Sequence, residues 1–196
     1  MRRVFAAAVC AVLMATGAYA KTFTGGFHVS GDAFSDPGLV VNTYPSGGYG
    51  SFHLEDGEST TFHLFHIWTN EHYINQDDKV AQDINVGFKF AGVGSGTISG
   101  DTVGSHAYYG LFQGGSLSWD NPLALSFGHN ETLTLSLNDA NFNWGLFGTK
   151  AGYKHGAHVK LTATYEIAPV PLPASALLLL AGLGGLGVMR RRKVTG

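Results

Sequence analysis

Apolar and polar side chains alternate along most of the chain between residues 21 and 168. The segments 84–90, 123–127, 133–137 and 159–167 each place an apolar side chain at every second position. A period of two is typical of a strand with one face in a core and the other in water. No window sustains the 3.6-residue period of an amphipathic helix. The pattern therefore predicts an all-β domain.

The spacing and edges of these segments predict how the strands connect. Strand candidates recur about every 8 to 14 residues, as in an antiparallel two-sheet sandwich of jelly-roll or Ig-like type. Residues 61–68 are apolar on both faces, which indicates a central, covered strand. Asp56-Gly57 predicts a hairpin between its flanking strands. Residues 70–82 have room for one short helical turn, and the Gly-, Ser- and Thr-rich residues 91–106 predict a long loop or weak hairpin.

The first twenty residues have the features of a secretory signal peptide. Two arginines follow the first residue, an apolar stretch spans residues 4–14, and Ala18 and Ala20 form a small-x-small cleavage site. We expect signal peptidase to cut after Ala20. The single cysteine of the chain lies within this segment, so the predicted mature protein has neither a disulfide nor a thiol-based site.

Residues 169–196 form a second terminal segment with its own signals. The stretch 170–189 holds 20 mostly apolar residues, about 30 Å as a helix, which is enough for a thin membrane span. A basic cluster follows and acts as a stop-transfer signal on the cytoplasmic side. The sequence thus predicts one C-terminal transmembrane helix. The motif residues are Val170, Pro171, Leu172, Pro173 and Ala174, and the basic residues are Arg190, Arg191, Arg192 and Lys193.

The order of these features, a short proline-containing motif, an apolar span and an arginine cluster, resembles the PEP-CTERM sorting signal in its VPLPA form. Leu172 stands where the parent motif has Glu. The resemblance implies a Gram-negative host and recognition by an exosortase-type enzyme. It also implies removal of the tail and delivery to the cell surface or the exopolysaccharide matrix.

The charge of the middle segment limits its partners. Residues 21–168 contain six lysines, no arginine and 14 acidic residues, a formal charge of −8. Nucleic acids and anionic lipids attract basic surfaces, so neither is an expected partner of this domain.

Catalytic motifs give little support to an enzyme. The chain contains neither G-x-S-x-G nor H-E-x-x-H, and a G-x-G-x-x-G match at 182–187 lies in the apolar tail without a βαβ unit. His63 and His66 are three residues apart, so on a regular strand they point to opposite faces and share an ion only across a bulge. We expect no enzymatic activity and no tightly bound cofactor.

One polar connection offers oxygen ligands for calcium. Asn75, Asp77, Asp78 and Asp83 lie within nine residues, and Ca²⁺ prefers carboxylate and amide oxygens. The spacing is not that of an EF-hand. The alternative is a polar loop in which Asx side chains cap a turn.

Aromatic residues beside glycine-rich loops are candidates for stacking on sugar rings. Those expected to be exposed are Tyr44, Tyr49, Tyr108 and Trp119. Two functions remain open: a structural or adhesive, exopolysaccharide-associated matrix component, and a carbohydrate-binding sandwich module, with or without dependence on calcium. Trp68 and Trp144 are instead expected in the core.

Overall fold

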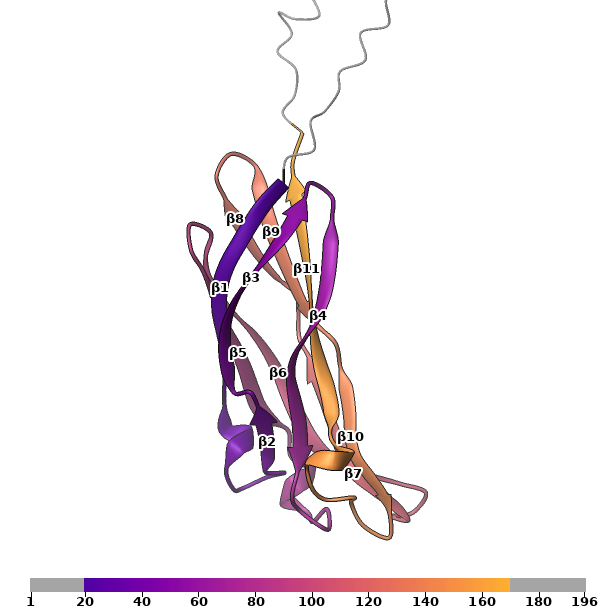
Figure 1. Ribbon diagram of the computed structural model, residues 1–196. Coiled ribbons are helices and arrows are strands. Elements are labelled where there is room, and N and C mark those ends of the chain that lie inside the picture. The colour runs from indigo at the N-terminus through magenta and orange to yellow at the C-terminus, as the bar shows by residue number, and fades with distance from the viewer. Residues whose placement is uncertain (1–19, 170–196) are drawn as a thin grey trace, which may run out of the picture.

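Residues 20–169, which the computed structural model describes, form two antiparallel β-sheets (Figure 1). A six-stranded sheet has the order β10-β7-β6-β5-β1-β3, and a five-stranded sheet has the order β2-β4-β11-β9-β8. The prediction of an all-β, two-sheet fold is confirmed. The strands are β1 (Ala20–Ser30), β2 (Val41–Tyr44), β3 (Gly47–Glu55), β4 (Ser59–Thr69), β5 (Gln82–Phe90), β6 (Gly94–Ala107), β7 (Phe112–Trp119), β8 (Leu123–Phe127), β9 (Glu131–Leu137), β10 (Ala140–Leu146) and β11 (Ala157–Ile167), and the short 3-10 helices are η1 (Asp32–Phe34), η2 (Asp77–Lys79) and η3 (Tyr153–His155).

The core lies between the two sheets and draws on both of them. Phe23 of β1 and Tyr165 of β11 are fully buried, and their ring centroids are 5.3 Å apart across the interface. Each buried strand contributes every second side chain, such as Ile84 and Val86 on β5 and Leu133 on β9. Residues 20–169 therefore contain a complete hydrophobic core of their own, which is what a segment needs to fold independently.

The alternating segments correspond closely to strands. The predicted segment 123–127 is β8, and the segments 84–90, 133–137 and 159–167 lie within β5, β9 and β11. Residues 61–68 lie within β4, which pairs with both β2 and β11. The predicted short helical turn is η2.

The predicted hairpin at Asp56-Gly57 is wrong. A tight turn does form there, because the amide of Glu58 donates to the carbonyl of Glu55 at 3.0 Å. However, β3 pairs with β1 in the six-stranded sheet, whereas β4 pairs with β11 in the five-stranded one. The turn therefore carries the chain from one sheet to the other, a choice made by long-range pairing rather than by the turn residues.

The predicted loop at residues 91–106 is also wrong. Residues 94–107 form β6, the longest strand, which pairs with β5 on one side and β7 on the other. Glycine weakens a strand, but nine aligned residues against β5 and eight against β7 override that preference. Ile98 and Thr102 still alternate inward and are buried.

Different segments lie at the two ends of the domain. β1 begins and β11 ends at the same end of the molecule, and the loops after β6 and β10 lie toward the opposite end (Figure 1). No helix within residues 20–169 is long and apolar enough to cross a membrane.

Several sequence predictions fall outside the described part of the chain. These are most of the signal peptide with Ala18, the sorting motif at 170–174, the expected transmembrane helix and the basic cluster at 190–193. Ala20 is the first residue of β1.

Candidate functional site

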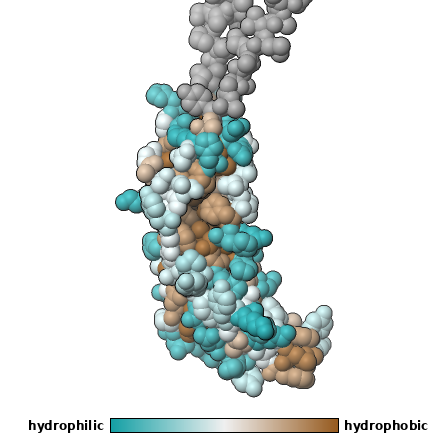
Figure 2. Space-filling view, viewed as in Figure 1, coloured by the Kyte–Doolittle hydropathy of each residue, from teal (hydrophilic) through white to brown (hydrophobic). Residues whose placement is uncertain are grey.

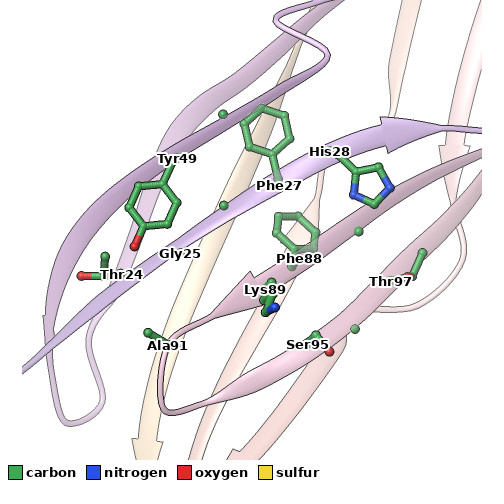
Figure 3. Close-up of a pocket in the computed structure, with 14 residues that line it drawn as sticks. Thr24, Gly25, Phe27, His28, Tyr49, Phe88, Lys89, Ala91, Ser95 and Thr97 are labelled. Atoms are coloured by element: carbon green, nitrogen blue, oxygen red, sulfur yellow. The ribbon is translucent and has the colours of Figure 1, made fainter.

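Four strands of the six-stranded sheet present a row of aligned residues on its outer face. Tyr49 of β3 pairs with Gly26 of β1, Gly26 pairs with Lys89 of β5, and Lys89 pairs with Ser95 of β6. Residues paired in this way lie on the same face, and neighbouring strands are about 4.8 Å apart, so the row spans about 14 Å. Figure 3 shows these side chains around a cleft.

A second row lies beside the first. It runs from Gly47 through His28 and Gly87 to Thr97. A Cβ atom at Gly87 would lie 2.6 Å from Cε1 of His28, so the His28 ring occupies the space above this glycine. In the first row, a Cβ atom at Gly26 would lie 2.7 Å from the carbonyl oxygen of Gly48 and 3.3 Å from the Tyr49 ring. Glycine at these two positions thus leaves room for neighbouring groups close to the backbone.

A cleft of about 730 Å³ opens at these two rows. We call it the glycine-floored cleft. Its lining consists of Thr24, Gly25, Gly26, Phe27, His28, Gly48, Tyr49, Gly87, Phe88, Lys89, Ala91, Ser95, Gly96 and Thr97. The lining therefore combines aromatic rings, hydroxyl groups and one ammonium group, and it contains no Asp or Glu.

Lys89 is the only lysine in this lining, and no carboxylate among residues 20–169 forms an ion pair with it. Lys89 is exposed. The ion pair found among residues 20–169 joins Lys21 to Glu131 at 2.6 Å, so Lys89 has no carboxylate partner in that part of the chain. The ammonium group is thus available to an anionic ligand.

A smaller hollow of about 420 Å³ adjoins the cleft and reaches toward the core. It shares Phe27 and Tyr49 with the cleft and adds apolar side chains, including Phe52 of β3 and Phe62 of β4. Figure 2 shows apolar surface along the middle of the molecule on this view. The two sheets are therefore incompletely closed along this side.

The four aromatic candidates do not come together. Tyr44 on β2, Tyr49 on β3 and Tyr108 in the loop after β6 are 67%, 78% and 77% exposed, as expected. Trp119 differs from expectation, because it is half-buried against the core and its indole N–H donates to the carbonyl of Asn138 at 3.1 Å. Of the four, Tyr49 alone lines the glycine-floored cleft.

The two tryptophans assigned to the core are not in its centre. Trp68 and Trp144 are both half-buried. The Trp144 ring lies over Gly114, where a Cβ atom would be 2.5 Å from the ring. This is a third case in which a glycine accommodates an aromatic ring.

Tyr108 belongs to an apolar group at the end of the molecule away from the start of β1. Its ring lies 5.9 Å from that of Phe112, and the amide of Phe147 donates to the carbonyl of Leu111 at 2.7 Å. Leu146 and Phe147 are 54% and 71% exposed. Apolar atoms are visible at the lower end of Figure 2.

The proposed calcium ligands take part in a capped turn. The Asn75 side-chain oxygen accepts the amides of Asp77 and Asp78, and the carboxylate of Asp78 accepts the amide of Asn75 at 2.7 Å. Asp83 lies apart on β5, opposite Asp101 of β6. Within residues 20–169, no group of three or more His, Asp or Glu side chains is arranged to hold a metal ion. The calcium site stays a prediction.

Asp78 also lies beside a second carboxyl group, that of Glu71. Burial raises the pKa of Glu71 to about 7, and the neighbouring charges of Asp78 and Asp36 add to the rise, while a hydrogen bond from the Val40 amide opposes it. Near neutral pH, Glu71 therefore retains a proton for part of the time and shares a hydrogen bond with Asp78.

Three histidines gather where β4 and β11 pair. A register shift between Val159 and Lys160 brings both His63 and His66 next to His158, with ring centroids 4.7 and 4.6 Å away. The register shift is the β-bulge that two histidines three residues apart need in order to lie on one face of a strand. Partial burial and the positive charges of His66, His63 and Lys160 lower the pKa of His158.

Taken together, the described residues define a two-sheet, all-β domain with an open cleft on one outer face. The chain carries a PEP-CTERM protein-sorting motif, matched over residues 169–193, which confirms the predicted PEP-CTERM signal, while its VPLPA form stays a prediction. The motif marks an exported protein that an exosortase-type enzyme processes for a surface or extracellular location. No curated protein and no solved structure matches the chain.

Sequence reasoning missed Lys89, His28 and the glycines between them as one surface. Their pairing depends on the order β3-β1-β5-β6, which joins segments far apart in the chain. The available signal was glycine at strand positions whose neighbours are aromatic, since a glycine inside a strand indicates close approach of another group.

Proposed function

We propose that this protein is a non-enzymatic component of the cell surface or extracellular matrix that associates with exopolysaccharide. The sorting motif at residues 169–193 carries the proposal. The fold agrees with it, because β11, the strand that precedes the sorting segment in the chain, ends at one end of the domain (Figure 1).

The route to that location has two processing steps. Signal peptidase cuts after Ala20, and the precursor is held by one C-terminal helix whose basic end is cytoplasmic. An exosortase-type enzyme that recognises the VPLPA form at residues 170–174 then removes the tail. The released domain remains with the exopolysaccharide, in a structural or adhesive role within a biofilm.

Fractionation of the native host tests this proposal. We expect the domain to co-purify with the exopolysaccharide and to have the mass of a chain without residues 1–20 and without the basic cluster. Replacing Arg190, Arg191 and Arg192 by Ser removes the stop-transfer charge and should release unprocessed protein. Mature protein found only inside the cell, or surface protein that still carries the basic cluster, would contradict the proposal.

The second candidate function is that of a carbohydrate-binding module. The glycine-floored cleft favours it, because its lining includes the exposed ring of Tyr49 together with the hydroxyl groups of Ser95 and Thr97. An aromatic face with polar neighbours suits a sugar ring. Binding of residues 20–169 to a glycan array separates this candidate from a purely structural role.

Calcium dependence of that module is a separate proposal for Asn75, Asp77, Asp78 and Asp83. A cation would offset repulsion among the acidic groups near η2. Binding to the folded state alone raises stability by about 2.7 kcal/mol at a calcium concentration 100 times the dissociation constant. The melting temperature should rise with calcium and fall with chelator, and the double replacement of Asp77 and Asp78 by Asn should abolish the response. An unchanged melting curve would leave these residues as a polar turn.

A further inference from the structure

We infer that the glycine-floored cleft binds a carboxylated polysaccharide, with Lys89 as its anion contact and Tyr49 as its stacking surface. This inference rests on the proposed association with exopolysaccharide and assigns that association a site and a ligand class.

The first argument is the local charge. The domain as a whole is acidic, which disfavours contact with an acidic polymer. The cleft is an exception, because its lining has no Asp or Glu and contains Lys89 without a carboxylate partner among the described residues. Asp83 and Asp101 share this outer face but lie six residues along their strands from Lys89 and Ser95, about 20 Å away. An anionic chain that crosses the strands at the cleft would therefore meet the charge of Lys89 without contacting these carboxylates.

The second argument is the shape of the floor. Gly26 and Gly87 have no side chains of their own, so the rings of Tyr49 and His28 lie close over the sheet backbone there and form part of a shallow floor. A flat, extended ligand fits such a floor better than a compact one. The row from Tyr49 to Ser95 spans about 14 Å, so an elongated chain can contact the ring and the ammonium group at the same time.

The third argument is the chemistry of the contacts. The face of the exposed Tyr49 ring provides apolar contact for the CH groups of a sugar. Ser95, Thr97 and Thr24 line the same cleft and offer hydroxyl groups that both donate and accept hydrogen bonds. Lys89 supplies a charge-assisted hydrogen bond to a carboxylate.

A single lysine also limits the anion. Lysine acts as a point charge, whereas recognition of closely spaced phosphates generally uses several cations or the fork of arginine. Residues 21–168 have no arginine. The cleft therefore offers one ammonium group for a carboxylate and lacks the several cations that recognition of a nucleic acid backbone generally uses.

Binding of residues 20–169, which contain a complete core, to polygalacturonate tests the inference, with neutral dextran as the comparison. We expect Lys89→Gln and Tyr49→Ala each to weaken binding to polygalacturonate about tenfold. The matched controls are Lys154→Gln on η3 and Tyr109→Ala in the loop after β6, both exposed and outside the cleft. Neither control should change the affinity, and high salt should weaken wild-type binding.

The outcomes separate the site from the broader function. Equal binding of dextran and polygalacturonate, or unchanged affinity in Lys89→Gln, would overturn the assignment of an anionic ligand. Unchanged affinity in Tyr49→Ala would overturn the stacking role. If the native protein co-purifies with exopolysaccharide and both variants do so equally, the proposed function stands and the site is wrong. If the native protein does not co-purify, the proposed function itself fails.

Discussion

Replacing Glu71 by Gln tests the proton-sharing pair near η2. Gln keeps a side-chain oxygen for the Val40 amide, which donates to Glu71 Oε1 at 2.7 Å, and its NH₂ group can donate to Asp78. Asp78 is only 1% exposed, so its partner strongly affects its energy. The substitution removes the titration of Glu71 while preserving its size and its hydrogen bonds.

The expected pH dependence follows from a raised pKa. Glu71 changes from an ordinary value of 4.5 to about 7 on folding. The folded state therefore binds the Glu71 proton more tightly than the unfolded state does. The resulting contribution to stability is fully present below pH 4.5 and is lost as the pH rises through 7. The whole shift corresponds to about 3.4 kcal/mol at 1.36 kcal/mol per pKa unit. Because Glu71 is half-buried and partly screened by solvent, we expect about 1 to 2 kcal/mol.

Urea denaturation at pH 5 and pH 8, followed by tryptophan fluorescence, measures the effect. Glu71→Gln should be about 1 to 2 kcal/mol more stable than the wild type at pH 8, with a smaller difference at pH 5. Glu166→Gln, at an exposed position on β11, serves as the control and should leave the pH profile unchanged. The reasoning is refuted if Glu71→Gln is no more stable than the wild type at pH 8, or if both lose stability equally between the two values.

Three further substitutions probe the rest of the domain. The pKa of His158 is lowered, so its contribution to stability is present above pH 6.5 and is lost as the pH falls. His158→Gln should therefore reduce the drop in melting temperature between pH 7.5 and 5.5. A drop equal to that of the wild type would contradict this. Tyr165→Phe removes a hydroxyl that donates a hydrogen bond to Glu131 at 2.8 Å, so the free energy of unfolding in urea should fall by about 1 to 2 kcal/mol. An unchanged free energy of unfolding would show that this hydrogen bond does not stabilise the fold. Asn143→Ala removes the side-chain oxygen that accepts a hydrogen bond from the buried Thr69 amide at 2.9 Å. We expect the free energy of unfolding to fall by about 2 to 4 kcal/mol and the Thr69 amide to exchange its hydrogen faster. Unchanged exchange at Thr69 would argue against this role.

The strands with a strong apolar alternation could be predicted from sequence because each carries its own signal. Ile84, Val86 and Phe88 identify β5 without reference to any partner. β6 could not be recognised, since many of its inward positions are glycine or threonine and its stability comes from the strands on either side.

The candidate site was less predictable than the fold. Tyr49 was identified by its exposure beside glycines, but Lys89 is forty positions away and joins the same row only through the strand order, with Gly26 of β1 between them. His63 and His66 show the same limit, because a bulge, which their spacing cannot reveal, brings them to one partner. Local pattern predicts strands, whereas the surface chemistry depends on register.

The place of β11 in its sheet has a mechanical consequence. The sorting segment follows directly from this strand, so a pulling force applied there reaches β11 first. β11 is an inner strand, with eight aligned residues against β4 and seven against β9. A force along its axis would shear both ladders at once instead of opening them one bond at a time. The domain is therefore built to resist tension at the end where its sorting segment is attached.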